Sequence, residues 1–278
     1  MRYINPTNDL AFKKVLGNND NIHILEGFIR DFFFIDPKGL TVENPYSIKA
    51  YREIIKNEEA FRLRLTVSDI AAVMDFADYR SELQIRKAVY FDERSLYYPL
   101  NKFVGRYKVE PGKGSAYSRL RPVYSLNILG YNHFSEDEDA LRIFQLYDPV
   151  RNKHFPKKLL NLGYFELLKP NIETENQRQW QNYFLQKPLS DNAPDYIRDA
   201  LQIIDESNMD KEELDMITQT ERLKDIMNNQ INYAVDEAEK MKSIEIARNL
   251  LEIGLSKEQI SEATGLDMNE ILEIESEM

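Results

Sequence analysis

Apolar side chains recur at helical spacing along the first part of the chain. Residues 8–16 and 21–34 each predict a helix, because their apolar residues fall three or four positions apart and share one helical face. In the second segment this face includes Phe28, Ile29 and Phe32. The turn-forming Pro-Lys-Gly at residues 37–39 ends that helix.

The apolar pattern changes to short runs typical of strands in the middle of the chain. Residues 63–87 predict two strands joined by a turn at residues 76–80, and residues 91–108 predict an amphipathic helix. Further strands are predicted at residues 122–131, 142–155 and 159–169. Helix, strands, helix and strands in this order predict an α/β core.

From about residue 190 onward the pattern is helical throughout. Residues 211–253 predict one long helix or two abutting helices with an apolar stripe. Gln230 interrupts the stripe one heptad after Leu223, which favours packing on the domain or on a partner helix over a firm coiled coil. We therefore expect a domain at residues 1–189 and an all-helical C-terminal region at residues 190–278.

The last residues of the chain predict a helix-turn-helix-like tail. Ser256 with Gln259, and Asp267 with Glu270, have the spacing of capping boxes that begin two short helices. A DNA-reading version requires basic and polar residues on its second helix, whereas this one is acidic. We expect a packing or dimerisation element, with a homodimer forming through the C-terminal helices.

The amino-acid composition excludes several classes of functional site. The chain of 278 residues contains no cysteine, which excludes disulfides, zinc thiolate sites and thiol nucleophiles. It has neither a signal-peptide pattern nor an apolar run long enough to span a membrane. We therefore expect a soluble, cytoplasmic protein with no membrane partner.

Charge is unevenly distributed along the chain. The formal net charge of −11 argues against a broad nucleic-acid-binding surface, because DNA affinity depends on phosphate neutralisation by lysine and arginine. Basic residues nevertheless cluster in the middle of the chain: Arg80, Arg86, Lys87, Arg94, Lys102, Arg106, Lys108, Lys113, Arg119 and Arg121. A local basic groove with weak or partner-assisted DNA binding is the expectation.

The candidate chemistry lies in the predicted hairpin. Asp69 belongs to its first strand, and Glu82 and Gln84 share one face of the second, because side chains alternate along a strand. A hairpin can bring Asp69 to the same edge. Two carboxylates on rigid strands suit a hard divalent cation such as Mg²⁺, which activates water and polarises a phosphoryl oxygen.

Several sequence blocks resemble one known family in order and spacing. They are NPTNDLAFKKVLG, VSDIAA, SELQI, ERSLYYPLNKFVGRY, RPVYSLNILGY, GYFELLKP with Glu166 and Lys169, and the tail from residue 247. Together they resemble the Rpn family of recombination-promoting nucleases and putative transposases, a branch of the PD-(D/E)XK nuclease superfamily. The resemblance implies a mixed β-sheet flanked by helices, and a DNA endonuclease that uses Mg²⁺, or alternatively Mn²⁺ or Ca²⁺, in recombination or transposition.

The resemblance also implies roles for individual residues. Asp69 and Glu82 would bind the metal, with Asp9 as an extra carboxylate from the first helix. Gln84 stands where many relatives carry lysine, so it can position the attacking water but cannot supply charge. That charge would come from either Lys13 or Arg94. The residues expected to contact substrate are Arg86, Tyr98 and Lys102.

A rival hypothesis belongs to a different class. The chain would then be a catalytically weak or inactive nuclease fold that acts as a protein-interaction module through its acidic helical tail. The net charge favours this hypothesis. A basic rim around Asp69 would favour the nuclease, and an acidic rim the interaction module.

Overall fold

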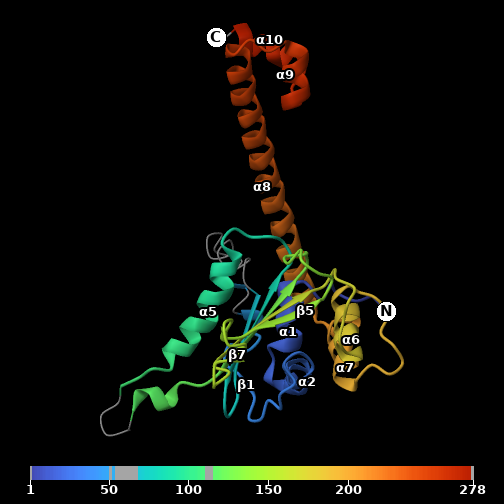
Figure 1. Cartoon of the computed structure of the whole chain (residues 1–278). Coiled ribbons are helices and arrows are strands. Elements are labelled where there is room, and N and C mark those ends of the chain that lie inside the picture. The colour runs from blue at the N-terminus through green and yellow to red at the C-terminus, as the bar shows by residue number, and fades with distance from the viewer. Residues whose placement is uncertain (1, 50–51, 54–67, 110–114, 277–278) are drawn as a thin grey trace. The chain divides into compact units, whose positions relative to one another are not determined.

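A six-stranded mixed sheet organises the first part of the chain (Figure 1). The computed structural model describes all residues except 1, 50–51, 54–67, 110–114 and 277–278. The predicted strand residues 63–67 and the basic residue Lys113 therefore lie outside the described residues. The strands are β1 (Thr41–Val42), β2 (Ser68–Val73), β3 (Asp78–Gln84), β4 (Val123–Leu129), β5 (Leu141–Phe144) and β8 (Leu160–Glu166).

The sheet has the order β1-β2-β3-β4-β8-β5. Its central pairs, β3 with β4 and β4 with β8, are parallel, whereas β1 with β2, β2 with β3 and β5 with β8 are antiparallel. Parallel neighbours need a crossover connection, and helix α5 (Phe91–Gly105) supplies it between β3 and β4. The predicted α/β fold with a mixed sheet flanked by helices is confirmed.

Two local predictions were wrong. The turn between β2 and β3 lies at residues 74–77 rather than 76–80, because residues 78–80 pair with β2 on one side and β4 on the other. The segment 142–155 is not one strand, since after β5 it forms a separate hairpin of β6 (Tyr147–Asp148) and β7 (Lys153–His154). The Asp148 carboxylate accepts from the backbone N–H groups of Val150 and Arg151, which stabilises the intervening turn.

Helices cover both faces of this sheet. The main apolar core lies on one face and is closed by α1 (Asp9–Leu16), α2 (Ile22–Phe33), α6 (Glu175–Phe184) and α7 (Asp195–Ile203). Strand residues Tyr79, Leu83 and Phe165 join this core. Helix α5 lies on the other face, where Phe91 packs with Leu129, Leu162 and Tyr164 in a smaller cluster.

Local sequence explains where several helices begin. The Asn8 side chain accepts from the backbone N–H groups of Leu10 and Ala11 and so caps α1, and Thr174 caps α6 through the Gln177 N–H. Short 3₁₀ helices occupy Asn19–Asn21 (η1), Ala116–Arg119 (η2) and Glu206–Asn208 (η3).

Contacts divide the chain into two compact units after Thr218, whereas the sequence pattern had suggested a boundary after residue 189. Ile197 and Ala200 of α7, together with Met216 and Ile217, belong to the main core, which explains why this stretch belongs to the first unit. Helix α8 (Lys211–Glu252) is a single continuous helix whose later turns belong to the second unit.

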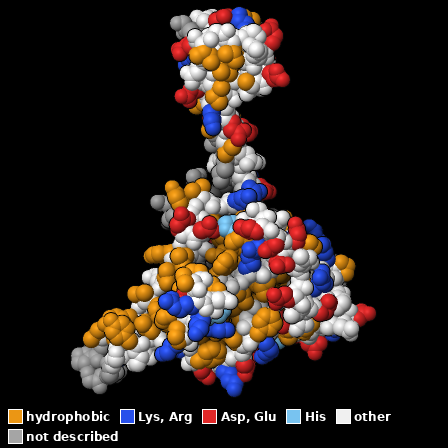
Figure 2. Space-filling view, in the orientation of Figure 1, with side chains coloured by type: hydrophobic (Ala, Val, Ile, Leu, Met, Phe, Trp, Pro, Cys, Tyr) orange, Lys and Arg blue, Asp and Glu red, His pale blue; other side chains and the backbone are white. Residues whose placement is uncertain are grey.

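The second unit has an apolar core of its own. After α8 it contains α9 (Lys257–Thr264) and α10 (Met268–Ser276), and Ile260, Leu266 and Ile271 pack against Ala247. Ser256 and Gln259 form a complete capping box, and Asp267 and Glu270 bond reciprocally in the same way. Figure 2 shows an apolar patch on the visible face of this unit, with acidic side chains around it.

Candidate active site

The N-terminal end of α5 meets the C-terminal end of β3, so the helix runs back along the strand. A four-residue step on a helix rises about 6.0 Å, and a two-residue step on a strand spans about 6.6 Å. One stripe of α5 can therefore contact one face of β3 over several turns. The four-residue step relates Arg94, which contacts Glu82, to Tyr98, which contacts Arg80. Arg106 follows the last residue of α5 and lies eight residues after Tyr98, and it contacts Asp78.

The two residues predicted to bind the metal are paired across the antiparallel ladder. Asp69 of β2 pairs in register with Glu82 of β3. Directly opposed residues belong to the same face of a sheet, with Cα atoms about 4.5–5.5 Å apart. The face concerned is the one that α5 covers, because Arg94 of α5 contacts Glu82.

Glu82 is buried and its charge is offset by an arginine. The side chain of Glu82 is 7% exposed, and its Oε1 accepts from Arg94 Nη2 at 2.8 Å. The same Arg94 nitrogen donates to Gln84 Oε1 at 2.6 Å. A buried carboxylate requires such a partner, because removing the charge from water costs several kcal/mol. Arg94 is thus the cation whose contact with Glu82 the structure describes.

The amide of Gln84 has a fixed orientation. Its oxygen accepts from Arg94, and its Nε2 donates to the backbone carbonyl of Arg86 at 2.7 Å. The guanidinium of Arg94 therefore supplies positive charge beside the position where many relatives carry lysine. The side chain of Arg86 itself is exposed.

The donor set suits a hard divalent cation. Mg²⁺ usually binds through one or two carboxylates and keeps several waters, so Glu82 and the residue type paired with it at position 69 are those that such an ion requires. Within the described part of the chain, no group of three or more histidine and acidic residues could hold a metal ion. A metal ion at this pair would share Glu82 with Arg94.

The other predicted site residues lie in three places. Asp9 and Lys13 belong to α1, whose buried residues join the core on the opposite face of the sheet. Tyr98 packs under the guanidinium of Arg80, 4.9 Å from the ring centroid, whereas its neighbour Tyr97 is 60% exposed. Lys102 forms an ion pair with Glu43 near β1.

Tyr131 is a neighbour of the site that the sequence reasoning missed. Burial raises its pKa to about 12, although the charge of Arg94 opposes this shift. Its buried hydroxyl has no hydrogen-bond partner among the described residues. Tyr131 follows β4, whose last residue Leu129 pairs with Gln84. The rule that ligands gather at the carboxyl ends of parallel strands could have found it.

Glu166 and Lys169 lie at the same end of the sheet, where their contacts are with the protein itself. Glu166 is fully buried, and its Oε1 accepts from the backbone N–H groups of His133 at 2.5 Å and Phe134 at 3.1 Å. Its Oε2 lies 3.0 Å from Lys169 Nζ, in an ion pair without hydrogen-bond alignment. These contacts fix the loop after β4 rather than leaving Glu166 open to a ligand.

No helix in the described part of the chain is both long enough and apolar enough to cross a membrane.

Comparison with known proteins identifies the family. Residues 6–243 match the model of the family described as PD-(D/E)XK nuclease family transposase. Neither the curated proteins nor the solved structures gave a match. The match extends over most of the chain, and the mixed sheet flanked by helices is consistent with a PD-(D/E)XK fold. The chain therefore belongs to the PD-(D/E)XK nuclease family transposases.

Proposed function

We propose that this protein is a divalent-metal-dependent endonuclease that hydrolyses phosphodiester bonds of DNA, and that it belongs to the Rpn branch of its family. The observation that carries the proposal is the register that opposes Asp69 to Glu82 on the face covered by α5. In this proposal the cut promotes recombination or transposition of a mobile element, and the preferred metal is Mg²⁺.

Asp69 and Glu82 would hold the metal ion. When bound, Mg²⁺ supplies Lewis acidity toward a phosphoryl oxygen and lowers the pKa of a bound water. Asp9 remains a candidate for a further carboxylate, and Lys13 for a further cation.

Arg94 and Gln84 would divide the task that one lysine performs in many relatives. Arg94 carries positive charge that can offset charge developing on the phosphate, where preorganised donors are most effective. Gln84 can hydrogen-bond the attacking water through its amide. Their existing contact, at 2.6 Å, holds both groups in place before substrate arrives.

The direct test is plasmid cleavage in the presence of Mg²⁺ or Mn²⁺. Asp69→Asn keeps the shape of the side chain but weakens metal binding, so cleavage is expected to fall by orders of magnitude. The matched control is Asp215→Asn, at an exposed position of α8. Equal cleavage by the two variants would retire the assignment of Asp69.

A second function is favoured by one observation on the second unit. Ile253, Met268 and Leu272 of this unit are 71%, 40% and 47% exposed, and Figure 2 shows an apolar patch with acidic side chains around it on the same unit. Exposed apolar side chains with a polar rim are typical of protein-interaction sites. Under this alternative the nuclease fold is inactive, and the helical tail binds a protein partner or a second copy of the chain.

Light scattering separates the two possibilities when it is combined with the cleavage assay. A full-length dimer that becomes a monomer when residues 254–278 are removed, with no cleavage by either form, would support the interaction module. Metal-dependent cleavage that disappears in Asp69→Asn would contradict it.

A further inference from the structure

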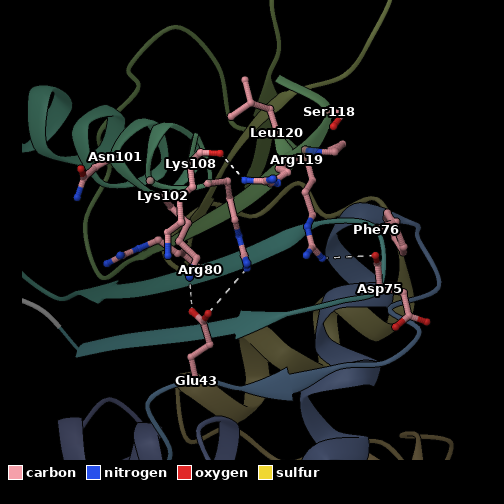
Figure 3. A pocket seen from close by; sticks show the side chains of 14 residues that line it. Glu43, Asp75, Phe76, Arg80, Asn101, Lys102, Lys108, Ser118, Arg119 and Leu120 are labelled. Carbon is pink, nitrogen blue, oxygen red and sulfur yellow. Dashed lines mark hydrogen bonds and ion pairs between the residues drawn. The ribbon is translucent and has the colours of Figure 1, made fainter. Parts of the chain in front are cut away.

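A basic cavity of about 790 Å³ opens near the N-terminal end of β3. Figure 3 shows cationic side chains from α5 and from the segment after it gathered above β2 and β3, with Glu43 reaching toward them. The cationic residues that line it are Arg80, Lys102, Arg106, Lys108, Arg119 and Arg121. Among the described residues that line it, only Glu43 and Asp75 carry a carboxylate.

Part of this positive charge is neutralised within the protein. Glu43 pairs with both Lys102 and Arg106, and Asp78 behind the cavity accepts from Arg106 Nε at 2.9 Å. Arg106 carries two carboxylate contacts, which together raise its pKa through hydrogen bonding and charge. These ion pairs hold the wall of the cavity in place but do not neutralise the other cations that line it.

Among the described residues, no carboxylate pairs with two of the remaining cations. Arg121 Nη1 donates to the backbone carbonyls of Met74 at 3.0 Å and Asp75 at 3.4 Å, which anchors the guanidinium but leaves its charge. Lys108 is exposed, and its ammonium has no hydrogen-bond or ion-pair partner among the described residues. The cavity therefore keeps a positive surplus in a chain whose net charge is −11.

The cavity is linked to the carboxylate pair through β3, which contributes a residue to each. Arg80 lines it and precedes Glu82 by two residues, so both belong to the same face of β3. Two strand residues span about 6.6 Å, and a nucleic acid strand carries one phosphate per about 3.4 Å of helix axis. Phosphates within a few nucleotides of one held by a metal ion at Glu82 can therefore reach this cavity.

We propose that the cavity binds the phosphates of the DNA strand that flank the phosphate to be cut, which a divalent metal ion at Asp69 and Glu82 would hold. This inference rests on the proposed function and adds to it a separate subsite, in which Lys108 and Arg121 contact the substrate backbone. Cations concentrated in a concave site attract a polyanion despite the acidity of the rest of the molecule. The anchored guanidinium of Arg121 also reduces the ordering cost of binding.

Fluorescence anisotropy with a labelled DNA duplex, in EDTA and over a salt series, tests the subsite without catalysis. Lys108→Gln removes one unmatched charge at an exposed position, so folding is retained. Loss of one phosphate contact reduces the salt slope by about 0.9 and weakens binding about eightfold at 0.1 M salt. Arg121→Gln is expected to act in the same direction.

The matched control is Lys187→Gln. Lys187 is exposed in the connection between α6 and α7, which cover the opposite face of the sheet, and the substitution removes the same charge. We expect its affinity and salt slope to equal those of the wild type. If Lys108→Gln and Arg121→Gln behave like this control, or if the wild type does not bind the duplex at 50 mM salt, the subsite does not exist.

The outcomes for the subsite and for the nuclease remain distinguishable. DNA binding that depends on Lys108, combined with equal cleavage by wild type and Asp69→Asn, would retain the subsite and reject the metal pair. Cleavage that depends on Asp69, combined with DNA binding that does not change in Lys108→Gln and Arg121→Gln, would retain the metal pair and reject the subsite. In the active enzyme, Lys108→Gln is expected to raise KM and leave kcat unchanged.

Discussion

Replacing Arg94 with methionine tests the contact that links α5 to β3 at the candidate site. Methionine retains much of the aliphatic length of arginine but removes its charge and its donors. In the wild type one Arg94 nitrogen serves both Glu82 Oε1 at 2.8 Å and Gln84 Oε1 at 2.6 Å. The variant therefore leaves a buried carboxylate and a buried amide oxygen without this donor.

The expected magnitude follows from burial. Removing one partner of a buried ion pair costs about 3–5 kcal/mol. Because the Arg94 side chain is 19% exposed and water can reach part of the site, we expect the lower end, about 3 kcal/mol. For a unit of about 200 residues this loss lowers Tm by roughly 6–12 °C.

Urea denaturation and thermal melting followed by circular dichroism measure this loss. The matched control is Arg86→Met, which makes the same substitution at an exposed position two residues after Gln84. We expect it to change the free energy of unfolding by no more than about 0.5 kcal/mol.

A double-mutant cycle with Glu82→Gln isolates the ion pair. Once Glu82 is neutral, replacing Arg94 no longer removes the partner of a buried charge. The double variant should therefore lose about 1–3 kcal/mol less free energy of unfolding than the sum of the two single losses. Strict additivity, or equal stability of Arg94→Met and Arg86→Met, would refute the reasoning that Arg94 compensates a buried Glu82.

Four further outcomes are expected. Mg²⁺ at about 100 times its Kd should raise the free energy of unfolding by about 2.7 kcal/mol in the wild type and by much less in Asp69→Asn, as monitored by thermal shift. Tyr131→Phe should raise Tm, because it removes a buried hydroxyl that lacks a hydrogen-bond partner among the described residues; a fall in Tm would show that the hydroxyl makes a stabilising contact. Burial raises the pKa of Asp31 although Asn176, Tyr196 and Trp180 donate to it, so its stabilising contribution is complete below pH 3.8 and declines as the pH rises through the raised pKa. The difference in unfolding free energy between wild type and Asp31→Asn should therefore shrink from pH 4 to pH 7; a constant difference would contradict a raised pKa. Deletion of residues 254–278 should leave the first unit folded, because the described apolar residues among them belong to the core of the second unit; loss of the strand signal in circular dichroism would show otherwise.

Much of the fold could be predicted from short-range patterns. The helical spacing in residues 21–34 predicted α2, and the alternation along the second predicted strand placed Glu82 and Gln84 on one face. Capping boxes at Ser256 and Asp267 predicted the starts of α9 and α10. Each of these patterns depends on residues within a few positions of one another, so it can be recognised without the tertiary structure.

The pairing of Asp69 with Glu82 required the register of two strands. A turn at residues 76–80 would have implied a different register, and a one-residue slip moves every side chain of a strand to the other face. Burial selects the observed register, because it places Ile70 and Ala72 in the core together with Tyr79 and Leu83.

Other features were decided only when distant segments packed together. The sequence left Lys13 and Arg94 as equal candidates for the cation, and the docking of α5 along β3 brought Arg94 to Glu82. It also gathered scattered basic residues around one cavity and placed Tyr131 beside the site. Local periodicity determines which face of an element is buried, whereas the partner of that face depends on the burial of the whole chain. The sequence by itself therefore predicted most of the helices and strands of this protein, because these depend on nearby residues. The tertiary structure decided which charged side chains contact one another, because those contacts join distant segments.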